Sequence, residues 1–216
     1  MSPLGSSALV FGGQNGEVYF NDLSAFDVNQ PYDRPDGTAW ETLLPNEPHP
    51  DRPLARANHT MVSWDDKLYL FGGTDGELWF SDLWQYSSSN GWTQLRGSSY
   101  FPEGRESHAA AVVDGVMFIF GGCNKEGRDL GDLHGYDFAK RRWSYFGTYH
   151  DFPSARSGHQ MAVHKEKIIM VGGEPYDRED LAVMYTLSPA SCFLRAELFG
   201  WSGPPWQNGQ GQESKW

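Results

Sequence analysis

The sequence predicts an all-β chain built from copies of one four-stranded antiparallel sheet. A sparse motif, Pro-x-x-Arg-x-x-His, occurs three times, at residues 53–59, 102–108 and 153–159. Four glycine pairs follow unbroken apolar runs, at Gly12-Gly13, Gly72-Gly73, Gly121-Gly122 and Gly172-Gly173. The chain also has 15% aromatic residues, 25 Gly and 13 Pro among its 216 residues. That composition is typical of short strands joined by tight turns rather than of long helices.

The apolar runs predict one central strand in each copy, at Ala8–Phe11, Leu68–Phe71, Val116–Phe120 and Ile168–Val171. Because side chains alternate between the two faces of a strand, an unbroken apolar run indicates that both faces are buried. A preceding strand is predicted in three copies, at Thr60–Trp64, Ala109–Val113 and Gln160–His164. The two residues between these strands, such as Asp114-Gly115, are typical of hairpin turns.

The third and fourth strands are predicted from recurring residues after each glycine pair. An Asp-Leu pair begins the third strand and an aromatic residue ends it, at residues 22–26, 82–86, 132–136 and 180–185. The fourth strand carries a tryptophan in three copies, at Trp40, Trp92 and Trp143. We expect these tryptophans to lie in the core between sheets. The fourth copy has no such tryptophan, and Phe193 is the best substitute.

A sheet with two apolar faces must be covered on both sides, so the copies are expected to stack. Twisted four-stranded sheets that radiate from an axis form a β-propeller. The glycine pair after an apolar strand, the Asp-Leu step, the spaced tryptophan and the period of about 50 residues resemble the kelch repeat. We therefore expect a kelch-type β-propeller of about four blades. It would be partial or open, because the first blade lacks its first strand.

The repeat also predicts the domain boundaries. A partial propeller is expected over residues 1–202, with blades at about 4–45, 53–97, 102–148 and 153–199. Residues 203–216 form a Gly/Gln-rich tail whose composition favours disorder.

Charge and cysteine content restrict the partners. The formal net charge is −11 without a basic run, which argues against nucleic acid or an anionic membrane surface. No stretch reaches the ~20 apolar residues of a membrane span, and the N-terminus does not resemble a signal peptide. Cys123 and Cys192 fit neither a disulfide framework nor a zinc site. We expect a cytoplasmic protein.

Antiparallel pairing brings the loops after the glycine pairs and the Pro-x-x-Arg-x-x-His segments to one end of the propeller. This end would gather three arginines and several acidic side chains: Arg56, Arg105, Arg156, Glu17, Asp75, Glu77, Glu126, Glu174 and Asp177. Such a ring is a candidate binding face, since arginine suits carboxylate and phosphate groups. The alternative is structural. An arginine at the same place in every copy can tie together its own loops, whose backbone groups need partners.

The motif histidines, His59, His108 and His159, are expected to pack or to form hydrogen bonds. A metal would need nitrogens about 2.0–2.1 Å from one ion, whereas equivalent residues on successive blades are spread around the axis. We therefore expect no metal and no cofactor.

The sequence predicts a non-catalytic protein–protein interaction module or scaffold. The segments SARSGHQMAVHKEKIIMVGG and NDLSAFDV resemble kelch proteins of fungal cell polarity and related eukaryotic adaptors. This resemblance implies binding of a protein partner through the loops at one end. Two alternatives stay open, a substrate-recognition propeller of a ubiquitin ligase and a kelch-like enzyme dependent on copper or iron. The exposed faces of an open propeller would also favour self-association.

Overall fold

A computed structural model describes residues 2–29, 40–147, 153–175 and 184–189. These residues form fifteen strands in four antiparallel sheets, which we number as blades 1 to 4. The all-β, propeller-type fold predicted from the sequence is confirmed. Within the described ranges, no helix is long and apolar enough to cross a membrane.

Each of the first three blades is a meander of four strands in sequence order. Blade 1 contains β1 (Ser2–Leu4), β2 (Ser7–Asn15), β3 (Val18–Asp27) and β4 (Trp40–Leu44). Blade 2 contains β5 (Thr60–Trp64), β6 (Lys67–Phe71), β7 (Leu83–Ser87) and β8 (Gly91–Gln94). Blade 3 contains β9 (Ala109–Val113), β10 (Val116–Phe120), β11 (Leu133–Asp137) and β12 (Arg142–Gly147). Blade 4 has three described strands, β13 (Arg156–His164), β14 (Lys167–Pro175) and β15 (Met184–Leu187).

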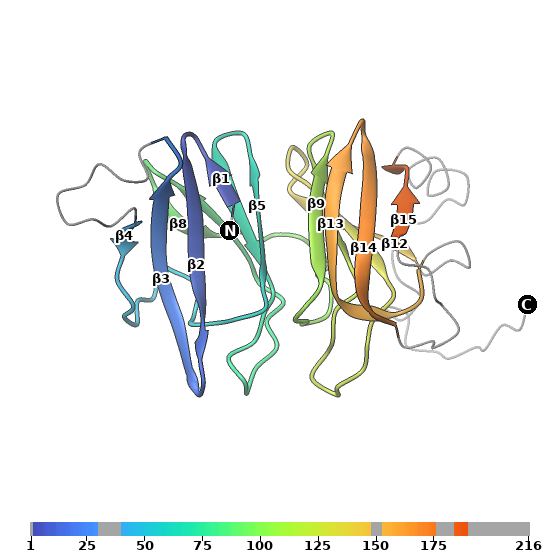
Figure 1. The fold of residues 1–216 in the computed structure, drawn as a ribbon, viewed down its shortest axis with the longest axis horizontal. Coiled ribbons are helices and arrows are strands. Elements are labelled where there is room, and N and C mark those ends of the chain that lie inside the picture. Colours follow the sequence, from blue (N-terminus) through green and yellow to red (C-terminus); the bar gives the residue numbers. More distant parts are fainter. Residues whose placement is uncertain (1, 30–39, 148–152, 176–183, 190–216) are drawn as a thin grey trace, which may run out of the picture.

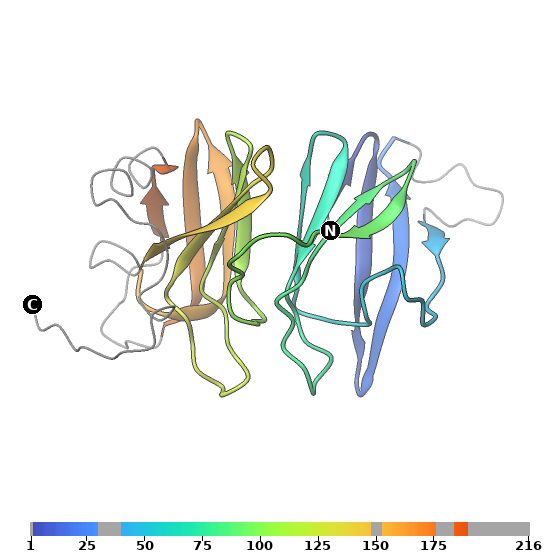
Figure 2. The same ribbon diagram turned by 180° about the vertical axis from the view of Figure 1, so that it is seen from behind.

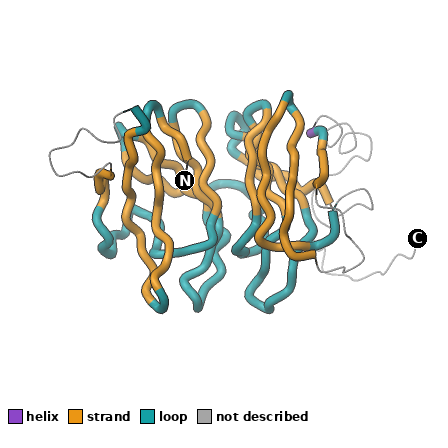
Figure 3. The backbone as a smooth tube through the Cα atoms, in the orientation of Figure 1, coloured by secondary structure: helices purple, strands orange, loops and turns teal. Residues whose placement is uncertain are grey.

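The first strands of the blades lie next to one another at the centre of the molecule. β1 contacts β5, β5 contacts β9, and β9 contacts β13. Figure 1 shows this succession from blue to orange, and Figure 2 shows it from behind. The tube in Figure 3 shows that the β2–β3 hairpin turn and the loops after β6 and β10 project together at the lower edge of the molecule.

The core consists of the layers between neighbouring blades. Phe71 of β6 and Ile119 of β10 belong to one such layer, in which blade 2 packs on blade 3. Phe120 and Met170 belong to the next, between blades 3 and 4. All five residues of β10 are buried, because alternate side chains enter different layers. The unbroken apolar runs therefore report burial on both faces, as the sequence predicted.

The hairpin turns between the first two strands of blades 2, 3 and 4 lie at the end opposite these loops, and their residues have left-handed backbone conformations. The turn residues Asp65-Asp66, Asp114-Gly115 and Lys165-Glu166 all have positive φ, between 48° and 72°. Two successive residues with positive φ are characteristic of type I′ turns, whose twist matches that of the strands they connect. The position of each hairpin agrees with the prediction.

Blade 1 corrects one prediction, because it does have a first strand. β1 pairs with β2 in the register Ser2↔Leu9 to Leu4↔Ser7. The hydroxyl of Ser2 also donates a hydrogen bond of 3.0 Å to the carbonyl of Met61 in blade 2. This strand is only three residues long and contains a proline, so it has neither the length nor the pattern of the other first strands.

The third strand of blade 4 differs from the prediction. The Asp180-Leu181 pair lies outside the described residues, as does the 30–39 insertion. In β15, Met184 pairs with Val171 just as Leu133 pairs with Phe120 in blade 3. Met184 therefore occupies the leucine position of this copy. The tail at 203–216 also lies outside the described residues.

Candidate functional site

Backbone hydrogen bonds bring the two predicted loop types together at one end of the propeller. Gly73 N–H donates to the carbonyl of Arg105 at 2.8 Å, and Gly122 N–H donates to that of Arg156 at 2.9 Å. Gly13 and Arg56 form the same contact between blades 1 and 2, at 2.9 Å. Each glycine-pair loop is thus fixed to the arginine segment that enters the following blade.

The arginine side chains do not reach the surface of this end. Arg105 is fully buried, and its guanidinium binds both carboxylate oxygens of Asp132, at 2.6 and 2.9 Å. The same group donates to the carbonyls of Glu103 and Gly121, at 3.1 and 3.0 Å. All of these partners belong to blade 3. The guanidinium therefore links the Pro-x-x-Arg-x-x-His segment to the glycine pair and to Asp132, which directly precedes β11.

Arg56 repeats this arrangement in blade 2. It is fully buried, binds both oxygens of Asp82 at 2.6 and 3.0 Å, and donates to the carbonyls of Leu54 and Gly72. Its guanidinium also lies 3.9 Å from the centre of the Phe80 ring. The ion pair therefore serves the structural role that the sequence left open as an alternative.

Arg156 is buried in blade 4 and makes the same two kinds of main-chain contact as Arg56 and Arg105. It donates to the carbonyls of Ser154 and Gly172, at 3.1 Å each, and to the hydroxyl of Tyr185 at 3.3 Å. Its guanidinium lies 4.9 Å from the centre of the Tyr185 ring. All three arginines thus lie inside the fold, and a ligand at the loop end would meet other side chains.

Asp132 is also held by a histidine that belongs to blade 3 alone. Nε2 of His134 donates to Oδ2 of Asp132 at 2.6 Å, and the hydroxyl of Tyr100 donates to Nδ1 at 3.0 Å. Hydrogen bonds from Arg105 and His134 keep the pKa of Asp132 below its ordinary value despite burial. Burial lowers the pKa of His134, so the imidazole is neutral and both ring nitrogens are used. In blade 2, the indole of Trp84 donates to Asp82 at 2.6 Å instead.

The motif histidines lie between the blades. Each ring meets the phenylalanine before the preceding glycine pair edge-on: Phe11–His59 at 5.6 Å, Phe71–His108 at 5.5 Å and Phe120–His159 at 5.6 Å. Nε2 of His108 also lies 2.8 Å from the hydroxyl of Thr60. Burial lowers the pKa of His59 to about 3 and that of His159 to about 4, and it lowers the pKa of His108 as well.

Among the described acidic residues of the predicted face, four lie in turns or loops, and Glu174 lies near the end of β14. Glu17, Glu77, Glu126 and Glu174 are exposed, Asp75 is partly buried, and Asp177 lies outside the described residues. Exposed apolar side chains accompany them at the same end, with Val18 54%, Leu54 57% and Leu78 55% exposed. The tip of the blade 1 loop contacts the blade 2 loop, because the ring of Tyr19 lies against Gly76. Two cations on the blade 3 loop, Lys125 and Arg128, are exposed as well, and Lys125 lies 3.7 Å from Glu126. The surface of this end is therefore mostly acidic and partly apolar.

A carboxylate that the sequence did not single out links two blades at this end. Glu106 of blade 3 accepts hydrogen bonds from the indole of Trp79 at 2.9 Å and from the side-chain amide of Asn58 at 2.8 Å. Both donors belong to blade 2. Because neither donor recurs in the other copies, the repeat pattern contains no information about this contact.

Backbone groups join successive blades near the centre. Ser107 N–H donates to the carbonyl of Asn58, and Gly158 N–H donates to that of Ser107, both at 2.9 Å. These residues directly precede the motif histidines, and all three have positive φ, between 54° and 71°. We call Asn58, Ser107 and Gly158 the central row.

Two of the predicted tryptophans lie in the core. Trp92 packs on Phe11 of blade 1 at 5.2 Å, and Trp143 packs on Phe71 of blade 2 at 5.0 Å. Trp40 differs from the expectation, because it is 45% exposed and its ring packs at 5.2 Å on Phe26 of its own blade. The burial of this tryptophan depends on the preceding blade, and none precedes blade 1 among the described residues.

The described ranges contain no group of three or more His, Cys, Asp or Glu side chains that could hold a metal ion. Cys123 is partly buried, its Sγ lies 3.6 Å from the carbonyl of Asn124, and burial raises its pKa. A raised pKa disfavours the reactive thiolate. Cys192 lies outside the described residues.

Comparison with known proteins identifies the family. Residues 1–173 match the family model described as the KLHDC2/KLHL20/DRC7 Kelch-repeats domain. The chain belongs to the kelch-repeat family. The resemblance drawn from the glycine pairs, the Asp-Leu steps and the tryptophans is thereby confirmed, and kelch-repeat membership indicates a propeller for protein interaction.

Several relatives align with most of the length of this kelch chain. Tip elongation aberrant protein 1 of Schizosaccharomyces pombe is 36% identical over 176 residues, which cover 81% of the chain and 15% of that protein. Kelch repeat-containing protein 2 of Saccharomyces cerevisiae is 31% identical, with 82% of the chain and 20% of that protein covered. Human Kelch domain-containing protein 3 is 30% identical, with coverages of 63% and 39%. The kelch chain thus spans well under half of these relatives, and the fungal matches are compatible with the expected subgroup.

Proposed function

We propose that this kelch propeller is a non-catalytic module that binds another protein through the loops at the end carrying Glu17, Glu77 and Glu126. The observation that supports this proposal is the composition of that surface, to which the three buried arginines do not contribute. The exposed charged side chains are mostly acidic, although Lys125 pairs with Glu126 on the blade 3 loop, and apolar side chains such as Val18 and Leu78 lie among the carboxylates.

This surface favours a partner with basic and apolar side chains. Apolar contacts at the centre of an interface supply most of its affinity, whereas charges of opposite sign increase the rate and the specificity of association. The net charge of −11 acts in the same direction at long range. Glu174 extends the acidic surface to blade 4, and Asp75 adds a second carboxylate to the blade 2 loop.

Affinity capture with matched variants tests the proposal. The loop variant combines Glu77→Lys with Leu78→Ser. The control combines Glu166→Lys with Val28→Ser, which makes the same changes of charge and polarity at the opposite end. We expect the wild type and the control to capture proteins that the loop variant does not bind. Equal loss from both variants would contradict binding through this end.

Two outcomes would replace the proposal by another function. Recovery of ubiquitin-ligase scaffold subunits among the loop-dependent proteins would indicate a substrate-recognition propeller. Stoichiometric copper or iron in the purified protein would contradict a non-catalytic module and indicate an enzyme. Metal analysis by mass spectrometry separates these classes directly.

We also propose that the protein is cytoplasmic and has a role in cell polarity. A reducing compartment fits a chain with two cysteines and no disulfide pattern. The polarity role is supported by the likeness to Tip elongation aberrant protein 1. Fluorescent tagging of the protein in its own cells should show cytoplasmic signal concentrated at sites of growth, and a uniform distribution would contradict the polarity role.

We also propose that the outer face of blade 4 binds a second copy of the chain. Val171 and Met184 pair across β14 and β15 and are 47% and 64% exposed. At the same register position in blades 2 and 3, Phe71 and Phe120 pack on the next blade. Analytical ultracentrifugation should show a concentration-dependent dimer that Val171→Lys abolishes, whereas a monomer at all concentrations would contradict self-association.

A further inference from the structure

The tip of the β2–β3 hairpin carries an asparagine that is directly followed by a glycine. Asn15 ends β2 and pairs with Val18, so Gly16 and Glu17 form a two-residue turn. Gly16 has a φ of 64° at the first central position of this turn, which is typical of type II′ turns. Asn15 and Gly16 are both exposed. A side-chain amide and the main-chain nitrogen of a glycine therefore lie next to each other in contact with solvent.

Neither of these two groups is held in place by the rest of the described chain. Among the described residues, the side-chain amide of Asn15 and the main-chain N–H of Gly16 have no hydrogen-bond partner. A Cβ at Gly16 would have no atom within 4 Å, so nothing packs against this side of the turn. Glycine also has the widest range of backbone conformations. The nitrogen of Gly16 is therefore free to turn towards the side chain of Asn15.

We propose that Asn15 is a site of spontaneous deamidation. The main-chain nitrogen of Gly16 attacks Cγ of Asn15, a C–N bond forms, and the side-chain nitrogen takes up the proton of Gly16 and leaves as ammonia. Water, the only co-reactant, then opens the cyclic imide. Cleavage of the bond between Cγ and nitrogen gives aspartate. Cleavage at the main-chain carbonyl gives isoaspartate, in which the main chain is one atom longer.

A second Asn-Gly pair within the described residues, Asn90-Gly91, provides an internal control. Asn90 is also exposed, but its main-chain N–H donates to Oγ of Ser87 at 3.3 Å. Gly91 pairs with Ser87 as the first residue of β8. The nitrogen of Gly91 is thus less free to reach the side chain of Asn90. In the folded protein, Asn15 should deamidate roughly two- to tenfold faster than Asn90, the factor that one hydrogen bond accounts for.

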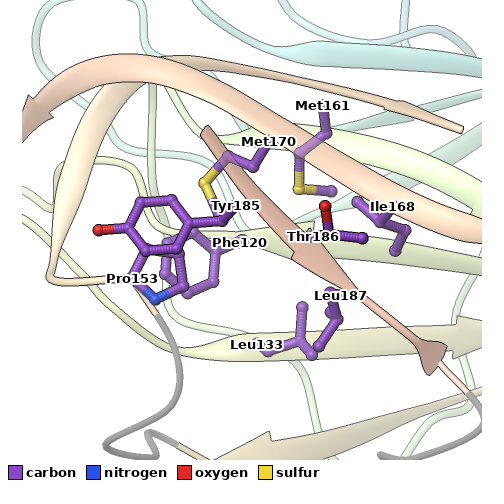
Figure 4. A pocket seen from close by; sticks show the side chains of 9 residues that line it. All are labelled: Phe120, Leu133, Pro153, Met161, Ile168, Met170, Tyr185, Thr186 and Leu187. Carbon is purple, nitrogen blue, oxygen red and sulfur yellow. The ribbon is translucent and has the colours of Figure 1, made fainter. Parts of the chain in front are cut away.

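Two buried asparagines should react more slowly still. Nδ2 of Asn21 and Nδ2 of Asn124 each donate a hydrogen bond, of 2.9 and 3.0 Å, respectively. The pocket between blades 3 and 4, shown in Figure 4, also offers no reactive amide. Its described lining consists of apolar side chains together with Tyr185 and Thr186. Among these sites, the hairpin tip is the one at which the amide and a free glycine nitrogen meet.

Both products would alter the loop end of the propeller. Aspartate at position 15 adds a negative charge close to Glu17, on a surface that is already mostly acidic. Isoaspartate lengthens the main chain beside a two-residue turn and would displace the pairing of position 15 with Val18. The neighbouring Tyr19 lies against Gly76 of blade 2, so the change would reach the blade 2 loop. Weaker partner binding by the isoaspartate form rests on the proposed function, whereas the reaction itself does not.

Peptide mapping of the full chain tests the reaction. The purified protein is incubated at mildly alkaline pH, and each asparagine is followed by mass spectrometry. Deamidation at Asn15 should exceed that at Asn90 in the folded protein, and the two rates should become similar in denaturant. Gly16→Ala should slow the reaction at Asn15, because a side chain hinders the approach of the nitrogen. An unchanged rate at Asn90 in this variant shows that it remains folded.

Other mapping results would overturn the proposal. Equal rates at Asn15 and Asn90 in the folded protein, or a faster rate at Asn90, would show that the hairpin tip does not promote the reaction. A methyltransferase specific for isoaspartate provides an independent measurement. It should label aged wild type at the hairpin peptide and leave aged Asn15→Gln unlabelled there. Equal labelling of this peptide in both proteins would contradict the assignment.

A binding measurement separates the reaction from the proposed function. Anion exchange isolates the deamidated protein, because it carries one more negative charge than the starting material. The deamidated protein should capture fewer of the loop-dependent proteins than equally aged Asn15→Gln does. Equal capture would overturn the effect on partner binding, and the mapping result decides the reaction independently.

Discussion

Arg105 binds both carboxylate oxygens of Asp132 at 2.6 and 2.9 Å, with its guanidinium fully buried. The pair connects the segment that enters blade 3 to the third strand of that blade. Arg56 and Asp82 make the same connection in blade 2. A motif that appeared suited to binding a ligand is therefore part of the interior.

Removal of Asp132 should destabilise the protein strongly. Asp132→Ala leaves the Arg105 cation buried without its counter-charge, and breaking a buried pair in this way costs about 3–5 kcal/mol of unfolding free energy. Lys140→Ala removes only the exposed ion pair with Asp137 and should cost less than about 1 kcal/mol. Urea unfolding monitored by tryptophan fluorescence measures both values. Similar losses in the two variants would contradict the structural role of Arg105.

The buried histidines should make stability depend on pH. Burial lowers the pKa of His159 from 6.5 to about 4, so the unfolded chain takes up a proton that the folded chain excludes. The stabilisation is therefore present above about pH 6.5 and is lost as the pH falls towards 4, by up to ~1.4 kcal/mol per pH unit. His59 and His108 act in the same direction.

A phenylalanine at position 159 should reduce this dependence. His159→Phe keeps the edge-on contact with Phe120 and removes one titrating group. Urea unfolding between pH 7.5 and pH 5 should then show an unfolding free energy that changes less steeply with pH. The expected decrease in this slope corresponds to at most one proton taken up on unfolding. Val163→Phe introduces the same ring at an exposed, non-titrating position and should leave the slope as in wild type. An unchanged slope in His159→Phe would show that this histidine does not titrate on unfolding.

The tryptophans should differ in their contributions to stability. Trp143 is 4% exposed and packs between two blades, so Trp143→Ala should cost about 3–5 kcal/mol. Trp40→Ala should cost less than half as much, since that side chain is 45% exposed. Calorimetric melting temperatures compare the two. Equal losses would indicate that Trp40 is covered in solution.

A methyl group at Gly122 should be tolerated poorly. Its Cβ would lie 2.6 Å from the carbonyl oxygen of Glu106 and 2.8 Å from Cβ of His108, and the φ of 94° disfavours any side chain. Gly122→Ala is expected to cost about 2–5 kcal/mol. Gly127 also has positive φ but has nothing within 4 Å of its Cβ position, so Gly127→Ala should cost about 1–2 kcal/mol. Chemical denaturation of the two variants separates crowding from backbone strain.

The sequence predicts those parts of the fold that depend on local patterns. The hairpin at Asp114-Gly115 and the buried strand Val116–Phe120 follow from turn residues and apolar runs, which act within a few residues. The aspartate partners of Arg56 and Arg105 could also have been predicted from the sequence, because Asp82 and Asp132 recur 26 and 27 residues after these arginines.

The remaining features depend on contacts that occur once. The three residues of β1 are too few to show an alternating pattern, and the bond between Tyr100 and His134 has no counterpart among the described residues of the other copies. The exposure of Trp40 depends on a neighbouring sheet and not on its own sequence. The loop surface differs from the prediction for a related reason, because recurrence identified the arginines without indicating whether they point inward or outward.

The central row of Asn58, Ser107 and Gly158 has a consequence for the evolution of the repeat. Each link is a hydrogen bond between main-chain atoms, and three different residue types occupy the same position. If a whole repeat were inserted or deleted, the repeats that then become neighbours would therefore still offer a main-chain N–H donor and a main-chain carbonyl acceptor at this position. Blade number can change by gene duplication or loss without new side chains at this seam.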